Sequence, residues 1–344
     1  IMQVLRREHV EDLHRLTGIH REETKARHAI EDPPLRQLRH LMRHRALAEA
    51  AQPGRRRVGR DRGGAGERAQ PEAPAGPISV VDDGGREVRL AKPATRVVSL
   101  LPHATDLIVA LGATGQLVGR TRYDTASAIS HVPSVGGGLD PSIESIVALR
   151  PDLVLCWPDQ GSQNLAARLG ELGLAVYTGR SGRMADVRPT LERLGRLLGR
   201  ESAADSLAGQ IERDVQAVRA SVAGRPSPDV LFVMSWDPLM AAGGTTFIHD
   251  MLTAAGGRNV LGDVPTPAPM VSLEEVVRRQ PDAIVFSREG GEPRDLRSLP
   301  GWRDLQAVRE GRVLAVDANL VSRPGPQMGT AVRTLAEWLH REAP

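Results

Sequence analysis

Short apolar runs alternate with amphipathic stretches from residue 77 to the end of the chain, and this alternation restricts the fold that the chain can adopt. The sequence DDGG at 82–85 separates the runs 78–81 and 87–90, a pattern typical of a β-hairpin. Strands that alternate with helices form parallel sheets covered by helices on both faces. We therefore predict an α/β fold, whose further strands cover residues 97–101, 153–156, 175–177, 230–234, 283–286 and 313–316.

An internal repeat indicates that this body consists of two similar halves. Glu144 lies seven residues before the Pro-Asp pair at 151–152, and Glu274 lies seven residues before the same pair at 281–282. A Val-Pro pair precedes each motif, at 132–133 and at 264–265. The same residue types are also ordinary signals for the start and the end of a helix, so the spacing leaves both interpretations open.

One long amphipathic helix is predicted over residues 202–223. A helix of about 22 residues is about 33 Å long, which is enough to connect two lobes. Packing on a single sheet would produce the same periodicity, and both arrangements remain open. The predicted organisation is an N-terminal lobe at 77–182, helices at 183–224 and a C-terminal lobe at 225–344. The apolar positions, three or four residues apart, are Ala204, Leu207, Ile211, Val215, Val218 and Val222.

Residues 1–76 differ in composition from the rest of the chain. They hold 16 of the 45 Lys and Arg residues, 11 of the 42 Asp and Glu residues and six of the ten histidines. Residues 52–77 have almost no large apolar side chains, so burial cannot offset the entropy lost on ordering. We predict a basic extension that is disordered or results from a misread upstream frame. Clustered arginines also suit nucleic acid, but we expect no nucleic-acid partner. No continuous apolar stretch of a secretory signal is visible.

The motifs that usually carry enzyme chemistry are absent. The sequence has no phosphate-binding glycine loop, no GxSxG, no HExxH and only one cysteine, Cys156, which ends an apolar run and suits a core position. We therefore predict that the chain is not an enzyme, and we assign it no cofactor and no metal ligands. A metal-binding protein or metal-dependent enzyme is an alternative if His103, His131 and His249 converge between the two halves.

Candidate ligand residues follow the predicted strands, where α/β sheets present their binding sites. Aromatic residues are scarce in this chain at 3%, so their position after strands is informative. Aromatic faces together with an arginine suit a large, flat, partly apolar ligand with polar or anionic groups. Core tryptophans and a surface arginine are the alternative interpretation. The candidates are Pro102, Tyr123, Trp157, Trp236, Asn319 and Arg323.

Several ordered motifs resemble the helical-backbone (class III) substrate-binding proteins of ABC importers, and within them the cobalamin-binding branch. They are VVSLLPHATDLIVALGATGQLVGRTRYD, VGGGLDPSIESIVALRPDLVLCW, VSLEEVVRRQPDAIVF and VDANLVSRPGPQM. The resemblance covers residue 77 to the C-terminus. It implies two Rossmann-like lobes with parallel sheets joined by a single long α-helix, which residues 202–223 supply. It also implies a monomer that captures a small molecule between its lobes.

The resemblance further implies partners and a location. The ligand would be delivered to the permease and ATPase subunits of an importer, and Glu144 and Glu274 would dock to permease arginines. An exposed carboxylate near a helix start is well placed for such contacts. The location would be periplasmic or lipid-anchored outside the cytoplasm. A cytoplasmic sensor with the same fold is the alternative, because no signal peptide is visible.

On the ligand side, Tyr123 and Trp157 match aromatic cleft positions and Arg323 matches an arginine near the polar rim of a corrin. Asn319 stands where a cobalamin-binding relative has an aspartate. Two aromatic positions, each six residues before a docking glutamate, are Gly138 and Ala268 here. We expect a wider or differently shaped cleft as a result. Cobalamin or another corrinoid is the predicted ligand, with haem or a ferric siderophore as the alternative.

Overall fold

The computed structural model describes residues 76–158, 164–288 and 295–341. The prediction of a disordered or misread extension concerns residues 1–76 and, except for residue 76, falls outside the described residues. In the described part no helix is both long enough and apolar enough to cross a membrane.

The N-terminal lobe contains the predicted hairpin and a four-stranded parallel sheet. Strands β1 (Ile78–Val81) and β2 (Glu87–Leu90) pair in antiparallel orientation, as the turn sequence predicts. The sheet has the order β4-β3-β5-β6, and all its pairs are parallel. Its strands are β3 (Val97–Ser99), β4 (Leu117–Gly119), β5 (Leu153–Cys156) and β6 (Val176–Thr178), and its helices are α3 (Pro102–Ala110), α4 (Ile143–Ala148) and α5 (Leu165–Glu171).

The C-terminal lobe has a mixed sheet in the order β11-β10-β7-β8, with β9 paired to β7. Strands β7, β10 and β11 are parallel, as predicted. Strand β9, which was not predicted, is also parallel to β7, and β8 is antiparallel to β7. Only two residues separate β7 from β8, and a parallel pair needs a much longer crossover. The strands are β7 (Asp229–Trp236), β8 (Leu239–Ala241), β9 (Arg258–Asn259), β10 (Ala283–Arg288) and β11 (Val313–Asp317). The helices are α8 (Phe247–Ala254), α9 (Leu273–Arg279), α10 (Gln306–Arg309), α11 (Ala318–Val321) and α12 (Met328–Leu339).

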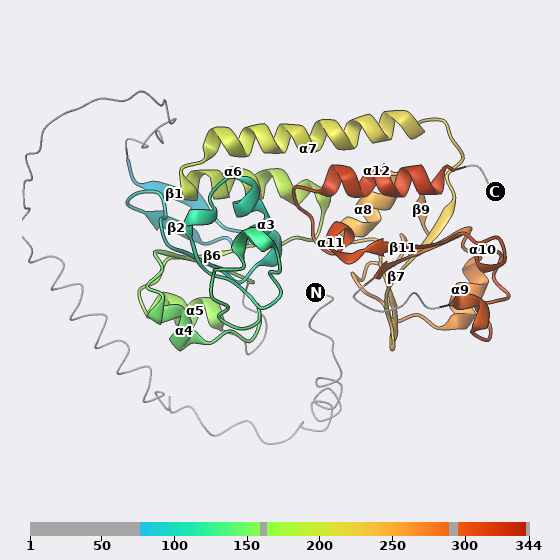
Figure 1. Cartoon of the computed structure of the whole chain (residues 1–344), viewed down its shortest axis with the longest axis horizontal. Helices are drawn as coiled ribbons and strands as arrows, with labels where there is room; N and C mark the ends of the chain where they lie inside the picture. Colours follow the sequence, from blue (N-terminus) through green and yellow to red (C-terminus); the bar gives the residue numbers. More distant parts are fainter. Residues whose placement is uncertain (1–75, 159–163, 289–294, 342–344) are drawn as a thin grey trace, which may run out of the picture.

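Helix α7 (Glu201–Val222) joins the two lobes, and its bounds lie within one residue of the predicted helix. At its start α7 packs against α6 (Val187–Leu198). A Cβ at position 195 would lie 2.7 Å from the Cβ of Ala204, so Gly195 allows this close contact. Farther along it packs against α12 and α8 of the C-terminal lobe. Figure 1 shows α7 running above both lobes. One hydrophobic cluster contains buried side chains from both lobes and from α7, so the lobes share a core, and each lobe also has a smaller cluster of its own.

The internal repeat has the same structure in both lobes. Ser142 caps α4 by accepting a hydrogen bond from a backbone N–H three residues later, and Ser272 caps α9 in the same way. Each helix is followed by a non-glycine residue with positive φ, Arg150 at 50° and Gln280 at 44°. The repeated residues therefore do act as helix start and end signals, and they do so in the same way in both lobes.

The aspartate of each Pro-Asp pair fixes the start of a neighbouring strand. Asp152 accepts hydrogen bonds of 2.9 Å from the backbone N–H groups of Thr95 and Arg96, immediately before β3. Asp282 accepts one of 2.7 Å from the N–H of Asp229, the first residue of β7. The repeated residues thus align the central strands of both sheets, whose carboxyl ends face the space between the lobes.

Candidate functional site

A cavity lies between the two lobes, at the carboxyl ends of β3, β5, β7 and β11. It encloses about 1070 Å³ of space, part of which is open to solvent. The N-terminal lobe contributes residues that follow β3, β5 and β6, and the C-terminal lobe contributes β7, the start of α8 and the region of α11.

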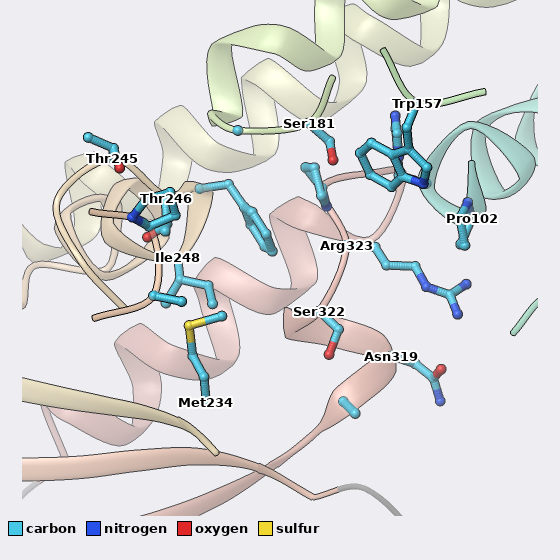
Figure 2. A pocket seen from close by; sticks show the side chains of 17 residues that line it. Pro102, Trp157, Ser181, Met234, Thr245, Thr246, Ile248, Asn319, Ser322 and Arg323 are labelled. Carbon is cyan, nitrogen blue, oxygen red and sulfur yellow. The ribbon is translucent and has the colours of Figure 1, made fainter. Parts of the chain in front are cut away.

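Four of the six predicted ligand residues line this cavity. Pro102 follows β3, Trp157 follows β5, and Asn319 and Arg323 follow β11. Figure 2 shows Trp157 and Pro102 on one side of the cavity, across from Met234. The structure therefore brings together residues that are more than 200 positions apart in the sequence.

The two remaining candidates lie elsewhere among the described residues. The Trp236 ring packs edge-on against Phe286 at 5.4 Å and Trp302 at 5.3 Å, measured between ring centroids. This is the core-tryptophan arrangement that was the alternative interpretation. Tyr123 is half-buried beneath the guanidinium of Arg122, 5.1 Å from the ring centroid. Neither Tyr123 nor Trp236 is among the described residues that line the cavity.

The start of α8 forms a wall of the cavity that was not predicted. The Thr246 hydroxyl donates to the carbonyl of Gly243 at 2.9 Å and accepts from the N–H of His249 at 3.1 Å, which caps the helix. A side chain at Gly243 or Gly244 would overlap a backbone carbonyl oxygen of the segment 262–266. The sequence GGTT at 243–246, a tight turn followed by a helix cap, is the signal that points to this wall.

Arg323 spans the gap between the lobes. Its guanidinium donates to the Asp106 carboxylate at 3.3 Å and to the backbone carbonyl of Tyr123 at 2.7 Å, both in the N-terminal lobe. Figure 2 shows the guanidinium turned toward Pro102 and away from Met234. Burial raises the pKa of Asp106, and the charge of Arg323 opposes this effect. The charge of Arg323 is therefore compensated by a carboxylate of the other lobe.

A second buried carboxylate lies near this ion pair. Asp124 accepts hydrogen bonds from the N–H and hydroxyl of Thr121, at 2.8 Å and 2.6 Å, through one oxygen. Its other oxygen, Oδ1, is buried with no hydrogen-bond partner. Burial raises the pKa of Asp124, while the Thr121 hydrogen bonds and the charge of Arg323 lower it.

His103 forms part of the aromatic wall and does not belong to a metal site. Its ring centroid lies 5.5 Å from that of Trp157, and burial lowers its pKa to about 3, so it is uncharged at neutral pH. His131 lies in a loop of the N-terminal lobe and His249 lies in α8. The described part of the chain has no group of three or more His, Cys, Asp or Glu residues that could hold a metal ion. The convergence that the metal alternative requires does not occur.

The two positions that lack an expected aromatic residue differ from each other. A Cβ at Gly138 would lie 2.7 Å from the carbonyl oxygen of Leu100 and 3.1 Å from Nε1 of Trp157. The expected widening does not occur there, because Trp157 already fills the space. Ala268, in contrast, lines the cavity, and its small side chain leaves room on the C-terminal side.

The two predicted docking glutamates are exposed in the first turns of α4 and α9. The Ser142 hydroxyl donates to Glu144 at 3.2 Å, and the backbone N–H of Glu274 together with the Ser272 hydroxyl lowers the pKa of Glu274. Figure 1 shows α4 and α9 in different lobes, both on the side away from α7.

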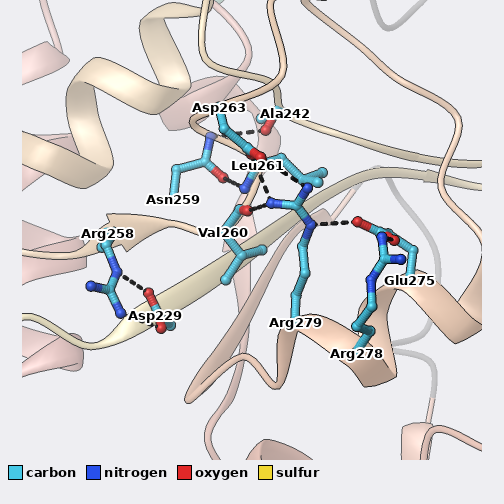
Figure 3. Close-up of polar contacts among 10 residues, drawn as sticks. All are labelled: Asp229, Ala242, Arg258, Asn259, Val260, Leu261, Asp263, Glu275, Arg278 and Arg279. Atoms are coloured by element: carbon cyan, nitrogen blue, oxygen red, sulfur yellow. Dashed lines mark hydrogen bonds and ion pairs between the residues drawn. The ribbon is translucent and has the colours of Figure 1, made fainter.

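The neighbouring Glu275 is bound within the protein. It forms ion pairs with Arg278 and with Arg279, and Arg279 also pairs with Asp263 at 2.7 Å (Figure 3). Neither docking glutamate has an ion pair among the described residues. Within the described part of the chain, the glutamate at the repeated position thus carries an unpaired carboxylate in each lobe, unlike its neighbour Glu275.

Two α/β lobes, a connecting helix and a cavity between the lobes define a two-lobed binding protein for a small molecule. The chain belongs to the periplasmic binding protein family, whose model matches residues 97–320.

Individual proteins similar to the chain narrow its class within this family. It is 29% identical over 272 residues to an uncharacterized ABC transporter substrate-binding lipoprotein of Bacillus subtilis, covering 77% of this chain and 86% of that protein. The structure of the periplasmic vitamin B12 binding protein of Vibrio cholerae matches with 26% identity and a TM-score of 0.63, covering 72% and 97%. That of a periplasmic haem-binding protein of Roseiflexus sp. matches with 27% identity and a TM-score of 0.64, covering 72% and 98%. The chain is thus a substrate-binding protein of the ABC-transporter class, a family of transport proteins and not of enzymes.

Proposed function

We propose that the chain captures cobalamin or a related corrinoid in the inter-lobe cavity and delivers it to an ABC importer. The observation that carries this proposal is the absence of uncompensated charge among the described residues that line the cavity. The two ionisable groups there are His103, which is neutral, and Arg323, which is paired with Asp106. A ligand without ionised groups around its rim fits such a site.

Neutral hydrogen-bonding groups line the cavity and suit the amide rim of a corrinoid. The Ser322 hydroxyl oxygen is buried with no hydrogen-bond partner. Trp157 offers an aromatic surface on the N-terminal side, and apolar side chains such as Met234 and Ile248 lie on the C-terminal side. Amide groups both donate and accept, so they can pair with hydroxyl and amide side chains without introducing charge. The groups that would do so are Ser181, Thr245, Thr246, Asn319 and Ser322.

Haem is the second candidate ligand. A structural relative is described as haem-binding, and Met234 presents a thioether to the cavity, a group that can coordinate haem iron. The Nε2 atom of His103 is buried within the wall and is not available as an iron ligand. The carboxylates of haem would meet one arginine that is already paired.

Ligand titration tests this proposal. We expect the full chain to bind cyanocobalamin or dicyanocobinamide at micromolar concentration or tighter, as followed by calorimetry. Haemin and a ferric hydroxamate siderophore are titrated in parallel. Asn319→Ala is expected to weaken corrinoid binding. The matched control is Gln306→Ala on α10. Asn259→Ala is not suitable as a control, because the Asn259 side chain supports the fold. Binding of haemin without binding of either corrinoid would exclude the corrinoid assignment.

We also propose that Glu144 and Glu274 dock the chain to arginines of a permease, with the ATPase bound on the cytoplasmic side. The chain would then act outside the cytoplasm, as a periplasmic or lipid-anchored monomer. Glu144→Gln combined with Glu274→Gln should abolish uptake and leave ligand affinity unchanged. Glu337→Gln, an exposed glutamate on α12, is the matched control. Loss of ligand affinity in the double variant would contradict the docking role.

A further inference from the structure

Exposed apolar side chains lie close in sequence to the two docking glutamates. In the described part of the chain four large apolar side chains are exposed: Val81 at 58%, Leu139 at 40%, Met270 at 75% and Val277 at 40%. Isolated apolar residues are common on protein surfaces, whereas a gathering marks an interaction site. Leu139 lies five residues before the glutamate of α4, and Met270 and Val277 lie four before and three after that of α9. Three of the four therefore flank a docking glutamate.

Leu139 is carried by a turn whose backbone is fixed. Gly136 and Pro141 form an antiparallel bridge across the turn, and Arg122 pairs with Asp140 at 2.8 Å. Gly136 has a φ of 109°, and a Cβ there would lie 2.9 Å from the Asp140 carbonyl oxygen. Only glycine therefore allows the turn to close. The backbone that carries Leu139 is therefore ordered before a partner binds, which reduces the entropy lost on binding.

The apolar side chains of the C-terminal lobe are held in a similar way. Met270 forms an antiparallel bridge with Met240 of β8, so its backbone is fixed while its side chain projects into solvent. Val277 lies three residues after Glu274 on α9, and residues at this spacing share one face of a helix. Each lobe thus presents a carboxylate and apolar surface from one small, ordered region.

The charges beside these apolar side chains favour a protein partner over a lipid surface. Segments that bind membranes combine apolar residues with unpaired Lys and Arg, whereas here the adjacent arginines, Arg122 and Arg278, are each ion-paired with a carboxylate. Protein interfaces combine an apolar centre with charged groups at the rim, and methionine is enriched in them. We propose that Leu139 in one lobe, and Met270 with Val277 in the other, pack against the two permease subunits beside Glu144 and Glu274. This inference rests on the proposed docking function.

Binding to the transporter tests this inference. The full chain is bound to the permease–ATPase complex of its own organism in lipid nanodiscs, and the affinity is measured by biolayer interferometry. The variant Leu139→Ser, Met270→Ser, Val277→Ser should bind about tenfold more weakly or worse, because buried apolar contacts dominate interface energies. The matched control Val81→Ser removes an exposed apolar side chain of β1, which packs near α6, and should bind like the unmodified chain. Thermal unfolding and corrinoid titration check that both variants fold and bind ligand.

The outcomes separate this inference from the docking function itself. Glu144→Gln with Glu274→Gln should also weaken binding and reduce its salt dependence. If these carboxylate variants weaken binding and the serine variant does not, the apolar contact is wrong and the docking function stands. If neither variant changes the affinity, the docking function fails as well. If the unmodified chain binds empty nanodiscs and the serine variant does not, lipid is the occupant and the inference is overturned. An equal loss of transporter binding in Val81→Ser would also overturn it.

Discussion

The ion pair between Arg323 and Asp106 should hold the lobes together before any ligand binds. Asp106→Asn, Arg323→Gln and the double variant form a cycle that isolates the interaction between the two side chains. Asp106 lies in the N-terminal lobe and Arg323 in the C-terminal lobe. The coupling energy therefore measures an inter-lobe contact and not the stability of one lobe.

The structure sets the magnitude that this cycle should give. The Arg323 side chain is 15% exposed and that of Asp106 is 31% exposed, so the pair is largely but not fully shielded from solvent. Hydrogen bonds to charged groups contribute about 1.5–3 kcal/mol, and exposed ion pairs contribute about 0.2–1 kcal/mol. We expect a coupling energy of about 1.5–3 kcal/mol. The exposed pair Arg122–Asp140, which lies within one lobe, serves as the control and should give less than about 1 kcal/mol.

Urea unfolding provides the free energies for this cycle, and ligand titration of the same variants shows what Arg323 does in binding. If Arg323 acts through the inter-lobe pair, both single variants should change corrinoid affinity by a similar factor. If Arg323 contacts the ligand directly, Arg323→Gln should weaken binding and Asp106→Asn should not. A coupling energy below about 0.5 kcal/mol would refute the inter-lobe pair, because such a value is typical of charges that do not interact.

Three further predictions concern the turn at Gly243, the two tryptophans Trp157 and Trp236, and the buried Asp124. Gly243→Ala should destabilise the fold by about 1–3 kcal/mol in urea, because its Cβ would overlap a backbone carbonyl oxygen, while Gly115→Ala, which has open space around it, should not. Trp157→Ala should weaken ligand binding with little loss of stability, and Trp236→Ala should do the opposite; equal losses of affinity in calorimetry would contradict their placement. Because burial raises the pKa of Asp124, the folded state takes up a proton that the unfolded state lacks, and stability should fall as pH rises from 3.8 through that pKa. In Asp124→Asn the free energy of unfolding, measured with urea across this pH range, should depend less on pH. An unchanged pH dependence would contradict the role of Asp124.

The elements that the sequence predicts correctly are those determined by local pattern. Strand β5 and both hairpin strands begin and end at the predicted residues, since an apolar run between turn residues defines a strand. Strands β4, β8 and β9 were missed, because two or three residues carry too little periodicity. The spacing of the repeated glutamates also predicts where α4 and α9 begin, because a serine cap and a first-turn carboxylate are local features.

The candidate site was less predictable, because side-chain direction depends on contacts that are distant in the sequence. Trp157 follows β5 and Trp236 ends β7, yet Trp157 faces the cavity whereas Trp236 meets Trp302, more than 60 residues later. Arg323 was expected to meet ligand, and nothing near it in the sequence indicates Asp106, 217 positions earlier. Sequence pattern thus located the edge of each sheet but not the partner of each side chain.

The inter-lobe contacts indicate how a ligand enters the cavity. Arg183, between β6 and α6, pairs with Asp250 of α8 through Nε at 2.8 Å, and the N–H of Met184 donates to the same carboxylate at 3.0 Å. This contact lies where the chain leaves the N-terminal lobe, next to the core that both lobes share through α6 and α7. Arg323, which contacts Asp106 and the Tyr123 carbonyl, lines the cavity, whereas neither Arg183 nor Asp250 is among the described residues that line it. We therefore expect ligand entry to separate Arg323 from Asp106 while Arg183 and Asp250 stay paired, so that the lobes open by a small rotation about α7.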